Sequence, residues 1–333
     1  MARRITIKDI AREANVHHAT VSRALRGSVS VSPDTAQRIK EAAERLGYEP
    51  DPMMAALAAY RKTTQPIKYK ETLAFLWPEQ TREEVRTSLY YRRSVEGAAA
   101  RAKELGYVLD EFHLCESPPR AFSRLMEARG IRGLIIGGYN RLTAAHLRFP
   151  INKLAVVAMT ASLKAPRLHR VEHDHFNGMR IALHEIKRRG FTRIAFMAGE
   201  RQDRVLEHRY SASFLMHHPL GLEAALGLME LVAMPGPDEM RAIVKRTGAD
   251  CLLMTYSPPE ATVPAPGGKT VPVFSLDLLP GETSFSGIYQ QMEQVAANAV
   301  DMVVEQLMHG QRGVAASCKT ILSGGEWIDR ATG

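Results

Sequence analysis

The chain has 333 residues, a formal net charge of +8 and a hydrophobic fraction of 45%. This length leaves room for a small domain and a large one, and the hydrophobic fraction is sufficient for a sizeable core. No apolar run approaches the ~18 residues of a membrane span, and the start, MARRITIKD, lacks the apolar region of a secretory signal. We therefore expect a cytoplasmic protein without a membrane partner, and these features argue against an exported binding protein.

The charge distribution and the cysteine spacing indicate which partners and cofactors the protein could have. The first 62 residues hold eleven Lys or Arg against seven Asp or Glu, which suits a polyanionic partner without identifying one. Cys115, Cys251 and Cys318 lie far apart, with no CxxC spacing and no histidine cluster nearby. This spacing favours reduced core residues, and we expect neither a metal nor another cofactor.

The first stretch, residues 5–25, has the pattern of two short helices around a tight turn. Thr6 can cap the first helix, and apolar residues then recur at helical spacing. Asn15 tolerates the left-handed conformation that a helix exit often needs. A second helix from about His18 to Leu25 would complete a helix-turn-helix, whose outward side chains meet base edges in a major groove. Those outward residues are His18, Ala19, Ser22 and Arg23.

A third helix is predicted to begin at Ser32 and Pro33. Serine is a favoured N-cap, and proline fits the first helical position because its missing N–H costs nothing there. Gly47 ends the helix. Its inner stripe should pack on the first two helices and close a small three-helix core; the stripe is Ile39, Ala42, Ala43 and Leu46.

Between Pro50 and Pro66 lies a short segment of different character. Residues 53–60 are good helix formers but make barely two turns, and an isolated helix of that length is marginal in water. The prolines on both sides separate this segment from its neighbours. We interpret residues 51–66 as a linker.

From about residue 71 short apolar runs alternate with helical stretches. Buried strands separated by helices indicate an α/β architecture of parallel sheets, and the number of strands favours two lobes. The predicted strands are 73–77, 107–112, 133–138, 154–159, 193–199, 230–234, 251–255 and 271–276. The predicted helices are 91–105, 177–189, 210–217, 239–246 and 292–308.

Ligand contacts in such a core should come from loops at the carboxyl ends of strands. Asp277 follows a strand and could accept hydrogen bonds from ligand hydroxyls or amines. Trp77 ends the first strand and could stack on a flat or sugar-like ligand, although packing is an equal alternative. Tyr256 is a third candidate at a strand end. The histidines His169, His173 and His175 could suggest a metal, but this spacing is more often a loop.

Several segments resemble a known family. TIKDIAREANV, ATVSRAL and VSPDTAQRIKEAAERLGYEP closely resemble the DNA-binding headpiece of the lac repressor family of bacterial transcription regulators, nearly without gaps over residues 5–50. EGAAARAKELGYVLDEF, ARGIRGLIIGG, RGFTRIAFMAGE and GIYQQMEQVAANAVDMVVEQL are similar to its effector core, which is akin to periplasmic sugar-binding proteins. The sequence departs from the family at Asn15, His17, Asp51 and His175, where glycine, serine, asparagine and asparagine are usual.

The resemblance implies a domain plan. Residues 1–50 would be an all-α helix-turn-helix headpiece, residues 51–66 a hinge helix and linker, and residues 67–333 a two-lobed effector-binding and dimerisation core. The chain would cross between lobes near Thr160, Gln290 and Thr320. The N-terminal lobe would then be about 71–160 with 291–319, and the C-terminal lobe about 161–290 with 320–333.

The resemblance also implies binding residues. Arg23 can hydrogen-bond guanine, His18 and Ala19 match positions that vary with operator sequence, and Leu57 with Met54 would wedge into the minor groove. Arg209 lies roughly where the family has a ligand-clamping arginine, and Asp277 matches its cleft aspartate. The full set of DNA-binding candidates is Thr6, His17, His18, Ala19, Ser22, Arg23, Arg26, Ser32, Tyr48, Met54 and Leu57. The effector-binding candidates are Trp77, Arg209, Tyr256 and Asp277.

Three function classes compete. A ligand-controlled DNA-binding regulator would act as a homodimer on double-stranded DNA, at a near-palindromic operator, with a small-molecule effector, a carbohydrate by analogy with the family. A non-exported small-molecule binding protein would leave residues 1–60 unexplained. An α/β enzyme would need a catalytic constellation, and the sequence contains no GxGxxG, GxxxxGK[ST] or strand-end GxSxG motif. We therefore expect no catalytic residues and favour the regulator.

Overall fold

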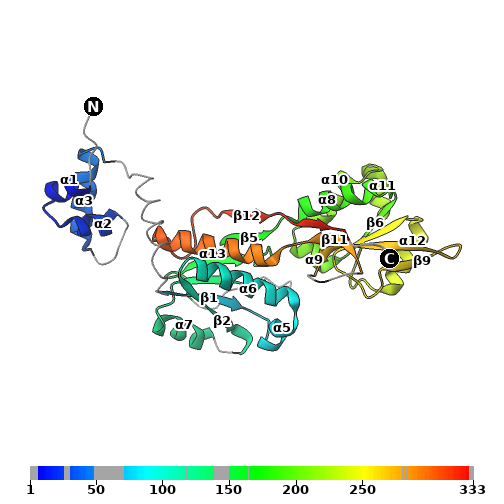
Figure 1. Ribbon diagram of the computed structural model, residues 1–333, viewed down its shortest axis with the longest axis horizontal. Helices are drawn as coiled ribbons and strands as arrows, with labels where there is room; N and C mark the ends of the chain where they lie inside the picture. Colours follow the sequence, from blue (N-terminus) through cyan, green and yellow to red (C-terminus); the bar gives the residue numbers. More distant parts are fainter. Residues whose placement is uncertain are drawn as a thin grey trace.

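The computed structural model describes residues 7–25, 31–48, 71–116, 119–138, 150–163, 165–279, 281 and 284–329. These residues form a three-helix unit and an α/β core with two sheets (Figure 1). None of the described helices combines the length and the hydrophobicity needed to cross a bilayer.

The three-helix unit contains α1 (Ile7–Glu13), α2 (His18–Leu25) and α3 (Pro33–Arg45). Ile10, Val21 and Ile39, one from each helix, are fully buried against one another, as the helical spacing predicts. Asn15 has a φ of 49°, so it adopts the left-handed conformation expected at the turn. Ser32 caps α3, because its Oγ accepts a hydrogen bond from the Thr35 N–H at 3.4 Å.

The first sheet of the core is parallel throughout, in the order β12-β5-β4-β3-β1-β2. Both of its faces are covered. Leu73 and Phe75 of β1 pack under α6 and α13, whereas Leu76 on the opposite face packs against α7. The strands are β1 (Glu71–Trp77), β2 (Tyr107–His113), β3 (Gly133–Ile136), β4 (Ala155–Met159), β5 (His169–His173) and β12 (Thr320–Ser323). The helices are α5 (Arg82–Thr87), α6 (Leu89–Glu104), α7 (Pro119–Ala128) and α13 (Met292–Met308), with a 3-10 turn at Leu114–Glu116.

The second sheet has the order β13-β11-β10-β8-β6-β7, with β9 paired antiparallel to β10. Phe196 of β6 packs with α8, α10 and α11 on one face, while Met197 on the other face packs with α12. The strands are β6 (Ile194–Gly199), β7 (Met229–Val232), β8 (Cys251–Met254), β9 (Thr262–Ala265), β10 (Lys269–Leu278), β11 (Ser286–Tyr289) and β13 (Glu326–Ile328). The helices are α8 (His175–Arg188), α9 (Glu200–Val205), α10 (Arg209–His217), α11 (Leu222–Leu228) and α12 (Pro237–Thr247).

The sheet pairing corrects two of the three predicted lobe crossings. β5 and β12 were expected in the C-terminal lobe, but β5 pairs with β4 and β12 pairs with β5, so both strands belong to the first sheet. The first crossing therefore follows His173 instead of Thr160, and the third follows Ser323 instead of Thr320. The second lies near Gln290, between β11 and α13, at the predicted position.

The same strand corrects the interpretation of the histidine spacing. His169 and His173 lie in β5 and His175 begins α8, so these residues do not form a loop. All three are buried. The His169 Nδ1 accepts a hydrogen bond from the Lys319 N–H at 3.0 Å, which ties the entrance of β12 to β5. Within the described residues, no three metal-ligating side chains gather closely enough to hold an ion.

Gly97 allows α6 and α13 to approach closely. A Cβ atom placed there would lie 2.2 Å from the backbone oxygen of Glu293, and backbone atoms cannot yield as a flexible side chain can. We predict that Gly97→Ala destabilises the core by about 1–3 kcal/mol, measured by calorimetric unfolding. Gly227→Ala is the matched control. Gly227 is a helical glycine with no neighbouring atom within 4 Å of such a Cβ, so alanine should stabilise α11 by about 0.5–1 kcal/mol. Equal effects at both sites would contradict the packing argument.

Candidate functional site

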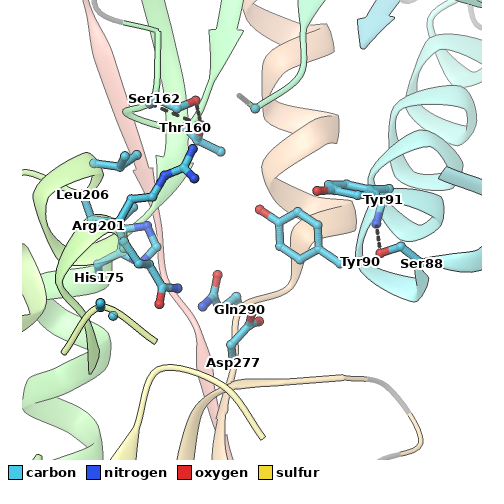
Figure 2. Close-up of a pocket in the computed structure, with 15 residues that line it drawn as sticks. Ser88, Tyr90, Tyr91, Thr160, Ser162, His175, Arg201, Leu206, Asp277 and Gln290 are labelled. Atoms are coloured by element: carbon cyan, nitrogen blue, oxygen red, sulfur yellow. Dashed lines mark hydrogen bonds between the residues drawn. The ribbon is translucent and has the colours of Figure 1, made fainter. Parts of the chain in front are cut away.

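A cavity of about 570 Å³ lies between the two lobes (Figure 2). Residues at the carboxyl ends of strands from both sheets line it, as expected for an open α/β fold. The first lobe contributes Ser88, Tyr90, Tyr91, Gly138, Thr160 and Ser162. The second lobe and the crossing beside it contribute His175, Gly199, Arg201, Gln202, Val205, Leu206, Ala233, Asp277 and Gln290.

The wall from the first lobe is aromatic and hydroxyl-rich. Tyr90 and Tyr91 occupy the first turn of α6, which Ser88 caps by accepting a hydrogen bond from the Tyr91 N–H at 3.5 Å. Burial raises the pKa of the Tyr90 hydroxyl, so this group stays neutral and can both donate and accept hydrogen bonds. The wall therefore offers ring faces and neutral polar groups to a ligand.

Thr160 holds a strained backbone at the edge of the cavity. Its φ is 70°, an unusual value for a β-branched residue, and its Oγ1 lies 2.8 Å from the Ser162 Oγ. In the described part of the core, Glu207, His208 and Gln291 also have positive φ without being glycine, and all three lie near the junction of the lobes. Strain of this kind persists only where the surroundings impose it, and it often accompanies a binding site.

The wall from the second lobe contains a buried chain of hydrogen bonds. The Gln290 Nε2 donates to the Tyr210 hydroxyl at 3.1 Å and to the Leu276 carbonyl at 3.0 Å, and the same hydroxyl lies 3.0 Å from the His175 Nδ1. Burial lowers the pKa of His175 well below its ordinary value, so the ring is neutral. These contacts fix the orientation of His175 and Gln290 at the cavity surface.

Asp277 lies at the carboxyl end of β10 and lines the cavity, as the sequence predicts. Burial raises the pKa of its carboxyl group to about 7, because the charged form loses its hydration there. Both the neutral and the ionised forms are therefore populated near neutral pH. Figure 2 shows this carboxyl group beside the Gln290 amide.

Trp77 does not reach the cavity, so the expectation that it stacks on a ligand is wrong. Its side chain is 1% exposed and packs in the core, with ring centroids 4.9 Å from Phe75 and 5.0 Å from Tyr91. The packing alternative is correct, because the alternation along β1 directs this ring beneath α6. Trp77 instead supports Tyr91, which does line the cavity.

Arg209 and Tyr256 also lie outside the cavity lining. The Tyr256 hydroxyl donates to the Pro235 carbonyl at 2.7 Å, and its ring packs against the apolar cluster that contains the buried residues of α12. Arg209 begins α10 and turns to Glu172 of the first sheet, at 2.7 Å from Nη1 to Oε1. Of the four predicted effector residues, only Asp277 faces the cavity.

Arg201, Tyr90 and Gln290 are lining residues that the sequence analysis missed. Arg201 follows β6 by two residues, so the strand-end rule that selected Asp277 could have found it. Tyr90 gave no such signal, because it begins a helix, and Gln290 lies in a stretch interpreted as a connection. Their positions depend on how the two lobes face each other.

An ion-pair network joins the lobes beside the cavity. The Glu172 side chain, on β5, is fully buried, and the Arg209 guanidinium also contacts Glu207, at 2.9 Å. Arg170 of β5 lies 3.9 Å from Glu172 and 3.8 Å from Glu207. A buried carboxylate is unfavourable without a cation, and the contact between the lobes places the Arg209 guanidinium beside Glu172.

Seven of the eleven DNA-binding candidates lie in the described part of the three-helix unit. His17 is exposed at the start of α2, where its carbonyl accepts from the Thr20 N–H at 2.8 Å. Ser32 caps α3, and Tyr48 is half-buried against the headpiece core. His18, Ala19, Ser22 and Arg23 belong to α2, but their side chains lie outside the described part. Thr6, Arg26, Met54 and Leu57 lie outside the described residues.

The described residues thus combine a helix-turn-helix unit with a two-lobed α/β core that has a polar interlobe cavity. Residues 6–51 match the family described as bacterial regulatory proteins, lacI family. This match covers the three-helix unit and not the two-lobed core.

Two curated relatives match a little over half of this chain. The chain is 27% identical to the HTH-type transcriptional regulator GntR of Pseudomonas aeruginosa over 203 residues, 61% of this chain and 56% of that protein. It is 28% identical to the HTH-type transcriptional regulator GalR of Lacticaseibacillus casei over 197 residues, 58% and 54% of the two chains. The matched region thus spans little more than half the length of these relatives.

Two solved structures are similar in fold over almost the whole chain. The transcriptional regulator CelR in its complex with cellobiose has a TM-score of 0.53 at 18% identity, covering 99% of this chain and 100% of that one. The lac repressor dimer bound to operator and the anti-inducer ONPF has a TM-score of 0.52 at 16% identity, covering 98% of both chains. The proteins named in these comparisons are transcriptional regulators.

The Glu172–Arg209 pair should stabilise the closed arrangement of the lobes. We predict that Glu172→Gln destabilises the protein by about 1–3 kcal/mol in calorimetric unfolding, because Arg209 then loses one of its two counter-charges and keeps the exposed Glu207. Glu207→Gln is the control, since Glu207 is 43% exposed and its pair with Arg209 should contribute less than about 1 kcal/mol. A Glu172→Gln effect no larger than the control would refute the bridging role.

Asp277 should make the stability depend on pH. Its folded pKa of about 7 exceeds the unfolded value of roughly 3.9, so the folded state holds an extra proton between these limits. Stability from this group is therefore present at low pH and is lost as pH rises towards 7. We predict that Asp277→Asn melts near the parent at pH 4 but above it at pH 8. The control Glu260→Gln alters an exposed surface carboxylate and should run parallel to the parent.

Proposed function

We propose that the chain is a transcriptional regulator, acting mainly as a repressor, that binds double-stranded DNA through residues 1–50 under the control of a small molecule in the interlobe cavity. The observation that carries this proposal is the packing of α2. Because Val21 and Ala24 are buried against α1 and α3, the opposite face of α2 is directed away from the headpiece core. That face can enter a major groove.

Symmetry determines the rest of the DNA complex. Two copies of the chain would place two headpieces on the half-sites of a near-palindromic operator. The lac repressor structure compared above is a dimer bound to operator, which supports the same arrangement here. Residues 51–66 would form the hinge between headpiece and core, with Met54 and Leu57 entering the minor groove.

The cavity offers a route for control. Both lobes contribute to its lining, so a ligand that contacts both walls changes the free energy of one lobe arrangement relative to another. Each hinge would be joined directly to an N-terminal lobe, so a change in the angle between the lobes would alter the spacing of the two hinges in a dimer. Such coupling is reciprocal: operator DNA must change ligand affinity by the same factor as ligand changes DNA affinity.

Two other classes receive less support. A binding protein without a DNA target would make no use of the matched segment 6–51. An enzyme would need reacting groups in the cavity, and the relatives compared above are named as regulators. We propose a non-enzymatic role in the cytoplasm.

The proposal can be tested by selection from random duplexes with the full-length protein, with and without a metabolite extract. Recovery of a near-palindromic consensus is the expected result. The control is the chain truncated to residues 67–333, which should recover no consensus. If the full-length protein selects no sequence under either condition, the regulator proposal is lost.

Arg23 should discriminate between operator and random DNA. An arginine on a recognition helix can bind guanine O6 and N7 together, and losing such a pair costs about 1–3 kcal/mol of specificity. We predict that Arg23→Ala weakens binding to the selected operator by roughly tenfold or more and weakens binding to random DNA much less. The control is Arg45→Ala, which removes a charge on α3 that pairs with Glu13 and should weaken both equally. Equal losses for Arg23→Ala would reassign this residue to phosphate contacts.

A further inference from the structure

The four charged side chains that meet between the lobes are balanced within each lobe. Strand β5 of the first lobe supplies Arg170 and Glu172, and the turn that leads into α10 of the second lobe supplies Glu207 and Arg209. Each lobe therefore brings one cation and one carboxylate to the contact. A set of this composition can keep each carboxylate beside a cation in more than one arrangement of the lobes.

Arg170 and Glu172 are neighbours because of the alternation along a strand. Residues two apart point to the same face of a sheet, so these two side chains leave β5 on one side. The Arg170 Nη1 lies 3.9 Å from the Glu172 Oε1, a distance that a small rotation of the guanidinium would shorten. Arg170 is thus a second cation for Glu172 on its own lobe, while Arg209 of the other lobe lies closer, at 2.7 Å.

The second lobe presents Arg209 from a turn that is firmly held. Glu207 and His208 both have left-handed backbone conformations, with φ of 59° and 60°. The buried Asp203 holds the turn: its carbonyl accepts from the His208 N–H at 2.9 Å, and its Oδ2 accepts from the Ser211 hydroxyl at 2.9 Å. The Arg209 Nη2 donates to the Glu207 Oε2 at 2.9 Å, so Arg209 has a carboxylate on its own lobe in either arrangement.

The pair across the lobes is held by charge more than by directed hydrogen bonds. Among the described residues, no hydrogen bond of good geometry reaches either carboxylate oxygen of Glu172, although Arg209 lies 2.7 Å away. A bidentate arginine–carboxylate pair would fix one geometry, whereas a contact without aligned donors does not. The Glu172 side chain is fully buried, so it needs a cation for as long as it stays buried.

We propose that Arg170, Glu172, Glu207 and Arg209 form an ion-pair switch with two positions. In the closed position Glu172 pairs with Arg209 across the lobes, which is the arrangement in this structure. In the open position the Arg170 guanidinium takes over Glu172, while Arg209 retains Glu207. This exchange of partners gives Glu172 a cation in both positions and so lowers the free-energy cost of separating the lobes.

The switch is continuous with the cavity wall. Val205 and Leu206 line the cavity, and Glu207 follows them directly in the same turn. An occupant of the cavity that moves this turn would therefore also move Arg209 relative to β5. The inference itself concerns the two lobes, and it holds or fails independently of the proposed DNA target and of the chemistry of the effector.

The test measures the distance between the lobes of the full-length protein by double electron–electron resonance. Spin labels attached at Lys103→Cys on α6 and at Lys245→Cys on α12 report on the two lobes, because both positions are exposed. Cys115 and Cys318 are exposed and are replaced by serine, whereas the buried Cys251 remains. An excess of unlabelled protein keeps labelled chains apart within any oligomer.

Two arginine variants should move the lobes in opposite directions. Arg209→Gln removes the closed partner of Glu172, so we expect the ratio of open to closed molecules to rise about fivefold or more. Arg170→Gln removes the open partner, so the ratio should fall by a similar factor. The fall is also measured in an Arg209→Lys background, which weakens the closed pair without removing its charge and so populates both positions.

A static clamp predicts the opposite sign for Arg170→Gln. The Arg170 Nη1 also lies 3.8 Å from the Glu207 Oε1 across the lobes, and loss of that contact alone would favour opening. In a Glu172→Gln background the fall in the ratio caused by Arg170→Gln should disappear, because the carboxylate that the two arginines share is gone. This second variant separates the exchange of partners from a general effect of removing a charge.

Arg189→Gln is the matched control. The Arg189 side chain is 20% exposed, against 19% for Arg170, and its acidic partners Glu185 and Asp329 belong to its own lobe. Its replacement should leave the ratio unchanged. The inference would be overturned if Arg170→Gln opened the lobes or left the ratio unchanged in the Arg209→Lys background, or if Arg209→Gln kept the parent distances.

Discussion

The buried carboxylate of Glu172 is the constraint on which the arrangement of the lobes depends. It lies on the first sheet with a fully buried side chain, and the cation closest to it, Arg209, comes from the second lobe. Separating the lobes would break this pair, and the Glu172 carboxylate would lose the cation closest to it. The pair stands beside the cavity and thereby helps to define the distance between its two walls.

The cavity surface is organised by contacts made behind it. Trp77 supports Tyr91 from the core, and Tyr210 orients His175 and Gln290 through buried hydrogen bonds. Of these five residues, Tyr91, His175 and Gln290 line the cavity, and Trp77 and Tyr210 lie behind them. Rigid support of this kind limits the freedom of the lining side chains, so a ligand meets groups that already have their binding orientation.

Sequence patterns were most informative where local rules and burial agree. Asn15, Ser32 and Gly47 begin or end helices through their own backbone and capping preferences, and each lies where the pattern predicts in the three-helix unit. The apolar strands of the core were found for the same reason. β5 was missed because its sequence, HRVEH, looks like a polar loop. It is a strand because partners far away in sequence satisfy its polar side chains, as Lys319 does for His169.

The sequence by itself determined the family resemblance, the helix-turn-helix, the α/β class of the core and the position of Asp277 at a strand end. The resemblance follows from matching motifs, whereas the other features follow from periodicity, capping and strand ends, which involve only a few residues. The tertiary structure decided the lobe crossings, the burial of Trp77, the pairing of Arg209 with Glu172 and the place of Arg201 in the cavity. Those features depend on how two sheets face each other, and that relation joins residues too distant in sequence for any local pattern to record.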